Sequence, residues 1–300
     1  MSKMKVLTIC ELRKQQEPLA VAIGFFDGVH LGHQQVIGNA VKYAKANDFK
    51  SVVMTFDRSP KAETGYLTPL DVKLQLFSEL GVDYVLVLEF NDVLKQLPAD
   101  DFIEAYLVAL GVTFISVGFD FKFGHLGIGD THLLQSRDAF QVAICEPKLM
   151  DGEKVSTTSI KESLAMGDLV AVRNMLGRDF SVNGTVVYGR QLGRTIGFPT
   201  ANLQLDEQQF LGLRGVFATN VHFNGEVYRG MTNIGFNPTA NLQEQLTVET
   251  HIFEFEADVY DRRLQLVFLE KIRDEVKFDG LDALVVQLEK DKIIAQNVQN

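Results

Sequence analysis

Residues 19–33 read LAVAIGFFDGVHLGH, which is an apolar run, a glycine-rich turn and the start of a helix. The run from Leu19 to Gly24 has the length of a buried strand. After the turn, apolar side chains recur at helical spacing, at Val36, Ile37, Ala40, Val41 and Ala44. Gly24, Gly28 and Gly32 loosen the backbone where this helix begins, and helix amide groups and the helix dipole point at such a turn. The stretch therefore predicts a strand, an anion-binding loop and a helix.

The same alternation of short apolar runs and helical segments continues to about residue 150. Further strands are predicted at residues 52–55, 84–88, 114–117 and 142–145, and further helices at residues 71–80 and 99–110. This pattern is typical of an α/β fold, a parallel sheet of about five strands covered by helices.

The pattern changes after Gly177. Two helical stretches within residues 159–176 are followed by alternating strands at residues 216–223, 226–234, 248–255 and 264–272, and by a helix at residues 281–294. Asn224 and Gly225, which both tolerate positive φ, predict a type I′ hairpin. We expect an α/β domain over residues 1–180 and a β-barrel closed by one helix over residues 181–300.

Composition narrows the class of protein. The net charge of −10 would repel a nucleic-acid backbone, so nucleic acid is not an expected partner. The apolar runs are too short to span a membrane, and no leader opens the chain. The only two cysteines, Cys10 and Cys145, lie in apolar, strand-like settings and are expected to be buried and inert. We therefore expect a cytoplasmic protein with no membrane partner.

His30 and His33 are the first candidate catalytic residues. Three positions apart at the start of a helix, they can converge on one anion, and an imidazole there can donate hydrogen bonds to departing pyrophosphate. Two alternatives stay open: the glycines form a tight turn that the histidines only cap, or the histidines bind zinc. Zinc is disfavoured because no cysteine or third close histidine completes a ligand set.

The string GFFDGVHLGH at residues 24–33 resembles that of bacterial FAD synthetases, members of the HxGH nucleotidyltransferase superfamily. GFDFKFG at residues 118–124 and VSTTSIK at residues 155–161 agree with that family. The resemblance implies that FMN attacks the α-phosphate of ATP, with ATP contacts from Gly24, Phe25, Asp27, Gly32, Ser156, Thr157 and Lys161 and flavin contacts from Asp120, Phe121 and Phe123. Without the resemblance, the alternating Phe119, Phe121 and Phe123 would be interpreted as one face of a strand, and the segment at Ser156 as an ordinary helix N-cap.

Two positions depart from the FAD synthetase pattern. Lys161 stands where the family has Arg, and TFDRSP at residues 55–60 has Ser59 where a histidine is expected. Lysine lacks the bidentate fork of arginine, and serine cannot carry a proton at neutral pH.

Residues 184–203 read GTVVYGRQLGRTIGFPTANL, with a glycine density that straight strands avoid. Glycines interspersed with Arg190 and Arg194 can cradle phosphates, and Thr200 and Asn202 offer the neutral oxygens that Mg²⁺ accepts beside ATP. The alternative is a purely structural barrel turn.

This second string resembles the riboflavin kinase motif. RGVFA at residues 214–218, NIGFNPTA at 233–240, VETHIF at 248–253 and IRDEVKF at 272–278 follow in the family's order, with Asn237 where the family usually has Arg. The resemblance implies Glu249 as catalytic base, Thr200 and Asn202 as Mg²⁺ ligands, ATP contacts from Gly189, Arg194, Gly197, Pro199, Thr200 and Asn202, and flavin contacts from Arg273, Glu275 and Phe278. Without the resemblance, Glu249 would be interpreted as an exposed strand residue. Arg273 and Glu275 would be interpreted as an ion pair in contact with solvent.

Together the two resemblances identify the chain as a member of the bacterial bifunctional riboflavin kinase/FAD synthetase family. They imply that riboflavin is phosphorylated to FMN and FMN is adenylylated to FAD, with ATP in both steps and Mg²⁺ as the cofactor. The alternatives are a riboflavin kinase with an inactive first domain, a non-catalytic flavin sensor, and a nucleotidyltransferase for another alcohol phosphate.

Overall fold

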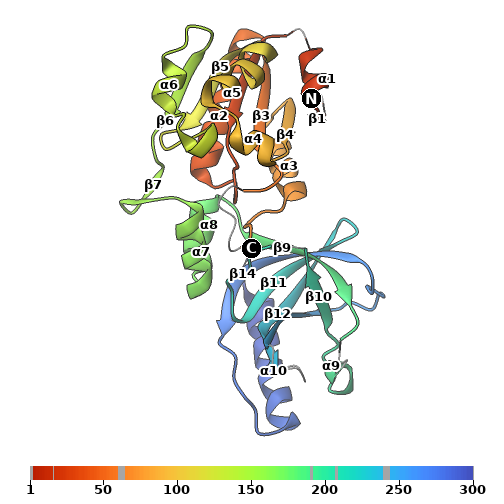
Figure 1. Cartoon of the computed structure of the whole chain (residues 1–300). Coiled ribbons are helices and arrows are strands. Elements are labelled where there is room, and N and C mark those ends of the chain that lie inside the picture. The colour runs from red at the N-terminus through yellow and green to blue at the C-terminus, as the bar shows by residue number, and fades with distance from the viewer. Residues whose placement is uncertain are drawn as a thin grey trace. The chain divides into compact units, whose positions relative to one another are not determined.

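The computed structural model describes residues 3–15, 17–59, 65–189, 192–206, 209–238 and 244–299. The chain forms two compact units, Met1–Thr157 and Thr158–Asn300 (Figure 1). This division lies before the domain boundary predicted near residue 180, because the second helix of the intervening pair packs against strands of the second unit.

The first unit is built on a parallel sheet. Its strands are β1 (Lys5–Leu7), β2 (Leu19–Ile23), β3 (Lys50–Phe56), β4 (Tyr84–Leu88), β5 (Val112–Gly118) and β6 (Gln141–Cys145), in the order β1-β4-β3-β2-β5-β6. The five predicted strands are confirmed. Sequence reading missed β1, which has three residues and no buried side chain to create an apolar run.

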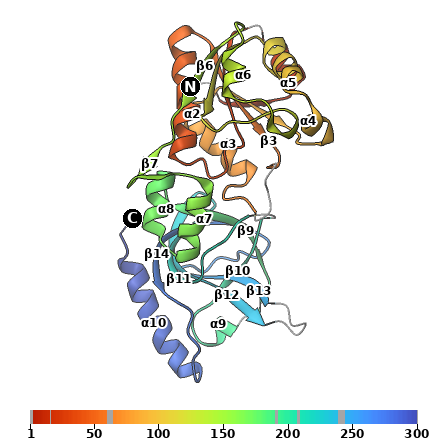
Figure 2. The same ribbon diagram turned by 60° about the vertical axis from the view of Figure 1, so that its left-hand side comes forward.

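Helices cover both faces of this sheet (Figure 2). They are α1 (Ile9–Arg13), α2 (Leu31–Asn47), α3 (Leu70–Glu79), α4 (Asp92–Gln96), α5 (Ala99–Tyr106) and α6 (Thr131–Gln135), with 3₁₀ turns η1 (Val108–Leu110) and η2 (His125–Gly127) and a β7 (Leu149–Met150)–β8 (Glu153–Lys154) hairpin. On one face of the sheet, Ile37 of α2 and Phe77 of α3 lie in the hydrophobic core. On the other face, Leu12 of α1 and Ile103 of α5 do so. The three helices predicted in this half are confirmed.

The strand order fixes where a ligand can bind. The chain runs from β2 outward through β3 to β4, and later returns to add β5 on the other side of β2. In an open α/β sheet, this reversal opens a crevice at the carboxyl ends of the two neighbouring strands. The loop after β2 and the loop after β5 carry the two motifs predicted to bind ATP and flavin.

The second unit is a closed antiparallel barrel. It contains α7 (Thr157–Met166), α8 (Leu169–Leu176), β9 (Phe180–Val187), α9 (Leu192–Thr195), β10 (Ala201–Leu205), β11 (Gly215–Phe223), β12 (Glu226–Pro238), β13 (Glu244–Ile252), β14 (Arg263–Arg273) and α10 (Leu281–Asn297). The strands close in the order β10-β13-β12-β11-β14-β9. The predicted barrel, its closing helix and the hairpin are confirmed: Asn224 and Gly225 have φ of 51° and 86°.

Inside the barrel, three threonines form a chain of hydroxyl contacts. Thr219 lies 2.9 Å from Thr232, which donates to Thr250 at 2.8 Å, and none of the three is exposed. On the outer face, α10 packs Ala295 against Met231 and Phe253. Because side chains alternate along a strand, the inward Thr250 turns its neighbours Glu249 and His251 outward.

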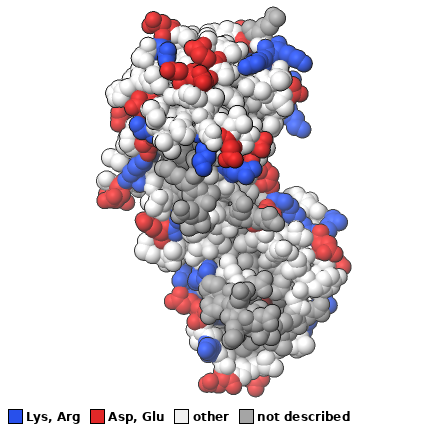
Figure 3. Space-filling model, in the orientation of Figure 1, with Lys and Arg blue, Asp and Glu red and all other residues white. Residues whose placement is uncertain are grey.

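One prediction about the cysteines is wrong. Cys145 is buried at the end of β6, but Cys10 lies in α1 and is exposed, because the first apolar run of the chain ends in a short surface helix. Across the described segments, the longest apolar helices fall short of what a bilayer crossing requires. On the face in Figure 3, acidic and basic side chains are interspersed in both units.

Candidate functional sites

The loop between β2 and α2 has a strained backbone. Phe26 and Val29 have φ of 55° and 42°, and Gly28 has φ of 84°. A β-branched residue in this region is an outlier, and such residues cost about 1–3 kcal/mol each. The three glycines serve different purposes: only Gly28 has a positive φ, whereas a Cβ at Gly24 would lie 2.9 Å from the Phe26 ring.

Hydrogen bonds from several elements hold this strained loop. The Asp27 carboxylate accepts from the Thr68 amide at 3.1 Å, and the Asp27 carbonyl accepts from the Thr157 hydroxyl at 3.1 Å. The Gln34 amide donates to the Val29 carbonyl at 2.9 Å. Asp27 is buried, so its contacts are made away from bulk water. The loop is thus fixed before any ligand arrives, which is the arrangement that electrostatic catalysis favours.

His30 and His33 stack on each other, with ring centroids 3.6 Å apart. His30 caps α2: its Nδ1 accepts from the His33 amide at 3.3 Å, so its Nε2 carries the proton. Burial lowers the pKa of His33 well below its ordinary value, and His30, Lys73 and Lys154 add to this effect. His33 is therefore neutral at physiological pH and can act as a hydrogen-bond donor. Gly32 permits this packing, because a Cβ there would lie 3.1 Å from the His30 ring.

The predicted flavin loop follows β5. Phe123 is buried in the sheet's core against Phe102, and Phe121 stacks on it with centroids 5.6 Å apart. The strand alternation considered for these aromatics is absent from this described segment, where Phe123 makes only an isolated bridge to Gly129. Asp120 pairs with Lys154 at 2.7 Å, so β8 is tied to the flavin loop.

The predicted triphosphate segment divides between the two units. Ser156 and Thr157 end the first unit, whereas Lys161 lies in α7 of the second, with its Nζ 4.9 Å from the Phe210 ring centroid. In the TFDRSP segment, the Thr55 hydroxyl donates to the Phe25 carbonyl at 3.1 Å, and the Ser59 amide donates to the Tyr66 hydroxyl at 3.2 Å.

The glycine-rich segment of the barrel packs closely on a predicted metal ligand. A Cβ at Gly189 would overlap the Asn202 amide, and one at Gly193 would overlap the Phe198 carbonyl. Gly197 has a φ of 84°, which favours glycine. Arg194 is exposed in α9, and Arg190 lies outside the described residues. The glycines therefore permit the backbone to lie close to Phe198 and Asn202.

Glu249 lies at the centre of a row across three strands. In the antiparallel register it stands opposite Asn202 of β10 and Asn233 of β12. Side chains directly opposite in such pairs have Cβ atoms about 4.5–5.5 Å apart on one face. The row brings together the predicted base and the predicted metal ligand Asn202, although nearly fifty residues separate them in sequence.

His251 supports this row. Its Nδ1 donates to the Pro199 carbonyl at 2.7 Å, immediately before Thr200, and its ring lies edge-on to Phe198. Burial lowers the pKa of His251, partly opposed by the bond to Pro199. An open pocket of about 510 Å³ adjoins it, lined by Gly197, Pro199, His251, Ile252, Glu254, Phe255, Glu256 and Lys292.

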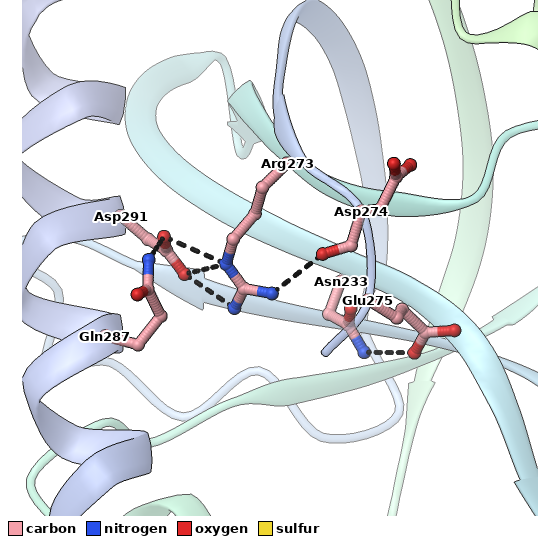
Figure 4. Close-up of polar contacts among 6 residues, drawn as sticks. All are labelled: Asn233, Arg273, Asp274, Glu275, Gln287 and Asp291. Carbon is pink, nitrogen blue, oxygen red and sulfur yellow. Dashed lines mark hydrogen bonds and ion pairs between the residues drawn. The ribbon is translucent and has the colours of Figure 1, made fainter. Parts of the chain in front are cut away.

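Arg273, which belongs to the predicted flavin segment, makes an ion pair with the buried Asp291 (Figure 4). Its guanidinium donates to both oxygens of Asp291 at 2.7–3.0 Å, and Gln287 donates to the same carboxylate at 2.8 Å. It also donates to the Asp274 carbonyl at 2.9 Å, and its centre lies 5.7 Å from the Phe278 ring. The default of a solvated Arg273–Glu275 pair is therefore wrong: Arg273 joins β14 to α10, and Glu275 instead lies against Gly235 and Asn233.

The oxygen donors Thr200 and Asn202 fit Mg²⁺ by their chemistry, since Mg²⁺ prefers hard oxygen ligands and keeps several waters. Glu249, opposite Asn202, adds a carboxylate to the same face. In the part of the chain that the structure describes, no cluster of three or more His, Cys, Asp or Glu side chains could hold a metal by itself.

Sequence reading missed Lys73, Lys154, His251 and Asp291. Lys73 had a signal: with Leu70 and Phe77 it falls on the inward stripe of α3, where a lysine is out of place. The other three become recognisable only through contacts between distant segments.

Comparisons with known proteins agree with this geometry. Residues 12–159 match the family model of FAD synthetase, and residues 176–299 match that of riboflavin kinase. The fold and the two sites thus define a class of protein that joins an FAD synthetase domain to a riboflavin kinase domain. Relatives from Listeria monocytogenes and Escherichia coli K12 are each 37% identical, over 91% and 94% of this chain and 90% and 93% of their own, and both are named bifunctional riboflavin kinase/FMN adenylyltransferase. The chain belongs to the bifunctional riboflavin kinase/FMN adenylyltransferase family.

A solved structure shares the fold over almost the whole length. It is described as a macrolide-efflux protein from Streptococcus pneumoniae, with a TM-score of 0.89 and 30% identity, over 98% of this chain and 99% of that one.

Proposed function

We propose that this chain phosphorylates riboflavin to FMN and adenylylates FMN to FAD, using ATP in both steps. The observation that carries the proposal is the row Asn202–Glu249–Asn233, which sets a carboxylate beside a glycine-rich turn within the riboflavin kinase match. We assign adenylyl transfer to residues 1–180 and riboflavin phosphorylation to residues 181–300. Because ATP and FMN are intracellular metabolites and both cysteines are free, we propose a cytoplasmic location.

In the kinase reaction, Glu249 acts as general base. It takes the proton from the terminal ribityl hydroxyl of riboflavin as that oxygen attacks the γ-phosphorus of ATP and ADP leaves. Thr200 and Asn202 would hold Mg²⁺, which would supply positive charge to offset that of the ATP phosphates. Gly189, Arg194, Gly197 and Pro199 bind the nucleotide, and His251 holds the Pro199 carbonyl in place. Glu275 and Phe278 contact the flavin from the segment that Arg273 anchors.

In the adenylyl transfer, an FMN phosphate oxygen attacks the α-phosphorus of ATP and pyrophosphate leaves. No protein base is needed because the nucleophile is already anionic. His30 and His33 donate hydrogen bonds to the leaving pyrophosphate, together with amides of the loop containing Gly24, Phe25, Asp27 and Gly32. Ser156 and Thr157 bind the triphosphate. Asp120 and Phe121 contact the flavin, and the buried Phe123 supports Phe121 from below.

The test follows both products by chromatography. The wild-type protein and a Glu249→Ala variant are incubated with ATP, Mg²⁺ and either riboflavin or FMN. We expect the wild type to form FMN and then FAD, and the variant to form FAD from supplied FMN but no FMN from riboflavin. FMN without FAD would favour the riboflavin kinase with an inactive first domain, which Ser59 and Lys161 support. If neither product formed, the proposal would be wrong and the alternative of a non-catalytic flavin sensor would be favoured.

A further inference from the structure

Lys73 is a buried lysine beside the phosphate-binding loop. Only 2% of its surface is exposed, although it lies in the first turn of α3. Its Nζ donates to the Phe25 carbonyl at 3.1 Å and lies 3.9 Å from the centre of the Phe25 ring. A lysine is almost never fully buried unless its charge is compensated, so these contacts need a reason.

The carbonyl that Lys73 contacts stands at the start of the strained turn. The next residue is Phe26, with its positive φ, and Val29 follows. Strained residues persist only where surrounding contacts over-determine them. On the Phe25 carbonyl, Lys73 from α3 meets the Thr55 hydroxyl from β3, so two elements hold one atom. A charged donor makes a stronger hydrogen bond than a neutral one.

We propose that Lys73 is a positioning residue for adenylyl transfer: its ammonium group holds the Phe25 carbonyl, and through it the loop, in the conformation that receives the nucleotide phosphates. This inference rests on the proposed adenylyltransferase function. Lys73 contacts the loop rather than the reacting atoms, so its substitution should alter the rate of FAD formation without changing the chemistry.

The charge state of Lys73 gives a signature that a merely structural side chain lacks. Burial lowers the pKa of Lys73 to about 8, opposed in part by the Asp27 carboxylate. Of the titratable groups near it, Asp27 faces it from the loop, and His33 from α2 is already neutral in this range. The second ionisation of a phosphate monoester, near pH 6, is complete by then. FAD formation should therefore fall as the pH rises through about 8.

The test compares Lys73→Met, Lys73→Arg and, as a matched control, Lys42→Met, an exposed lysine of α2. FAD formation from FMN and FMN formation from riboflavin are measured on the same preparations. Because Lys73 and the kinase residues lie in different units, the folding of the first unit is checked separately, by the midpoint at which heating abolishes FAD formation. We expect Lys73→Met to slow FAD formation roughly 10- to 100-fold, the effect of one charged hydrogen bond, and to leave the kinase unchanged. In Lys73→Arg, the decline near pH 8 should disappear, because arginine stays charged.

The outcomes separate the inference from the function on which it rests. If the wild type forms no FAD, the adenylyltransferase function fails. If the wild type forms FAD and Lys73→Met matches it, the positioning role is overturned. If Lys73→Met unfolds the first unit, which a lowered inactivation midpoint of FAD formation would show, Lys73→Arg decides: an unchanged decline near pH 8 refutes the role, and its disappearance supports it.

Discussion

Substitution of Asp291 by alanine should destabilise the kinase unit selectively. The Asp291 side chain is fully buried and the Arg273 side chain is 18% exposed, so removal of the carboxylate leaves a guanidinium charge largely out of water. Breaking a buried pair in this way costs about 3–5 kcal/mol. We expect the lower end, about 3 kcal/mol, because Arg273 keeps its bond to the Asp274 carbonyl and some solvent contact. For a domain of this size that is a fall in melting temperature of roughly 10 °C.

The two activities provide the assay, since the chain has no tryptophan to report unfolding. Samples are heated at one fixed rate, and residual riboflavin phosphorylation and residual FAD formation from FMN are measured separately. Asp291→Ala should lower the inactivation midpoint of the first activity and leave that of the second. Asp274→Ala is the control: Asp274 is 85% exposed in its pair with Lys271, and a surface pair contributes at most about 1 kcal/mol. Equal shifts in the two variants would refute the reasoning.

Three further predictions concern the kinase unit. Glu249→Gln should lower kcat for riboflavin phosphorylation about 10²- to 10⁴-fold with little change in KM, measured by steady-state kinetics; a change in KM alone would exclude the role of base. Gly189→Ala should raise the KM for ATP of the kinase, because the added Cβ overlaps the Asn202 amide, whereas Gly38→Ala, which meets open space in α2, should change neither activity. Acid should destabilise the barrel through His251: its folded pKa lies below the ordinary 6.5, so the unfolded chain binds more protons and stability falls as the pH drops below 6.5. Urea unfolding across this range should show a smaller loss in His251→Gln, and an identical loss would contradict the assignment.

Much of the fold could be predicted because its signals are local. The strand Tyr84–Leu88 was predicted to the residue, since a short apolar run of that length has few other structures available. The Asn224–Gly225 turn was predicted because only residues that tolerate positive φ close a two-residue hairpin. The errors lie where local signals are weak: β1 is too short to show a pattern, and Cys10 lies in an exposed helix.

The candidate sites divide in the same way. The chain's motifs located the loop at residues 24–33, the turn at residues 199–202 and Glu249. The helical spacing could mark Lys73 as an inward-facing lysine, but nothing in the sequence showed which segment Lys73 or Asp291 would contact. Lys73 is distinguished by the Phe25 carbonyl, 48 positions away, and Asp291 by Arg273. Each contact joins segments that are distant in sequence, so no hydrophobic period or motif spacing predicts it.

The sequence by itself determined the two domain types, the parallel and antiparallel sheets, and the glycines, histidines and carboxylate available for chemistry. These depend on hydrophobic periodicity and on the conformations open to single residues. Only the tertiary structure decided which of those groups meet and in what protonation state. Barrel register sets Glu249 between Asn202 and Asn233, and burial keeps His33 neutral and lowers the pKa of Lys73. Register and desolvation arise from segments distant in sequence packing together, and local patterns carry no information on them.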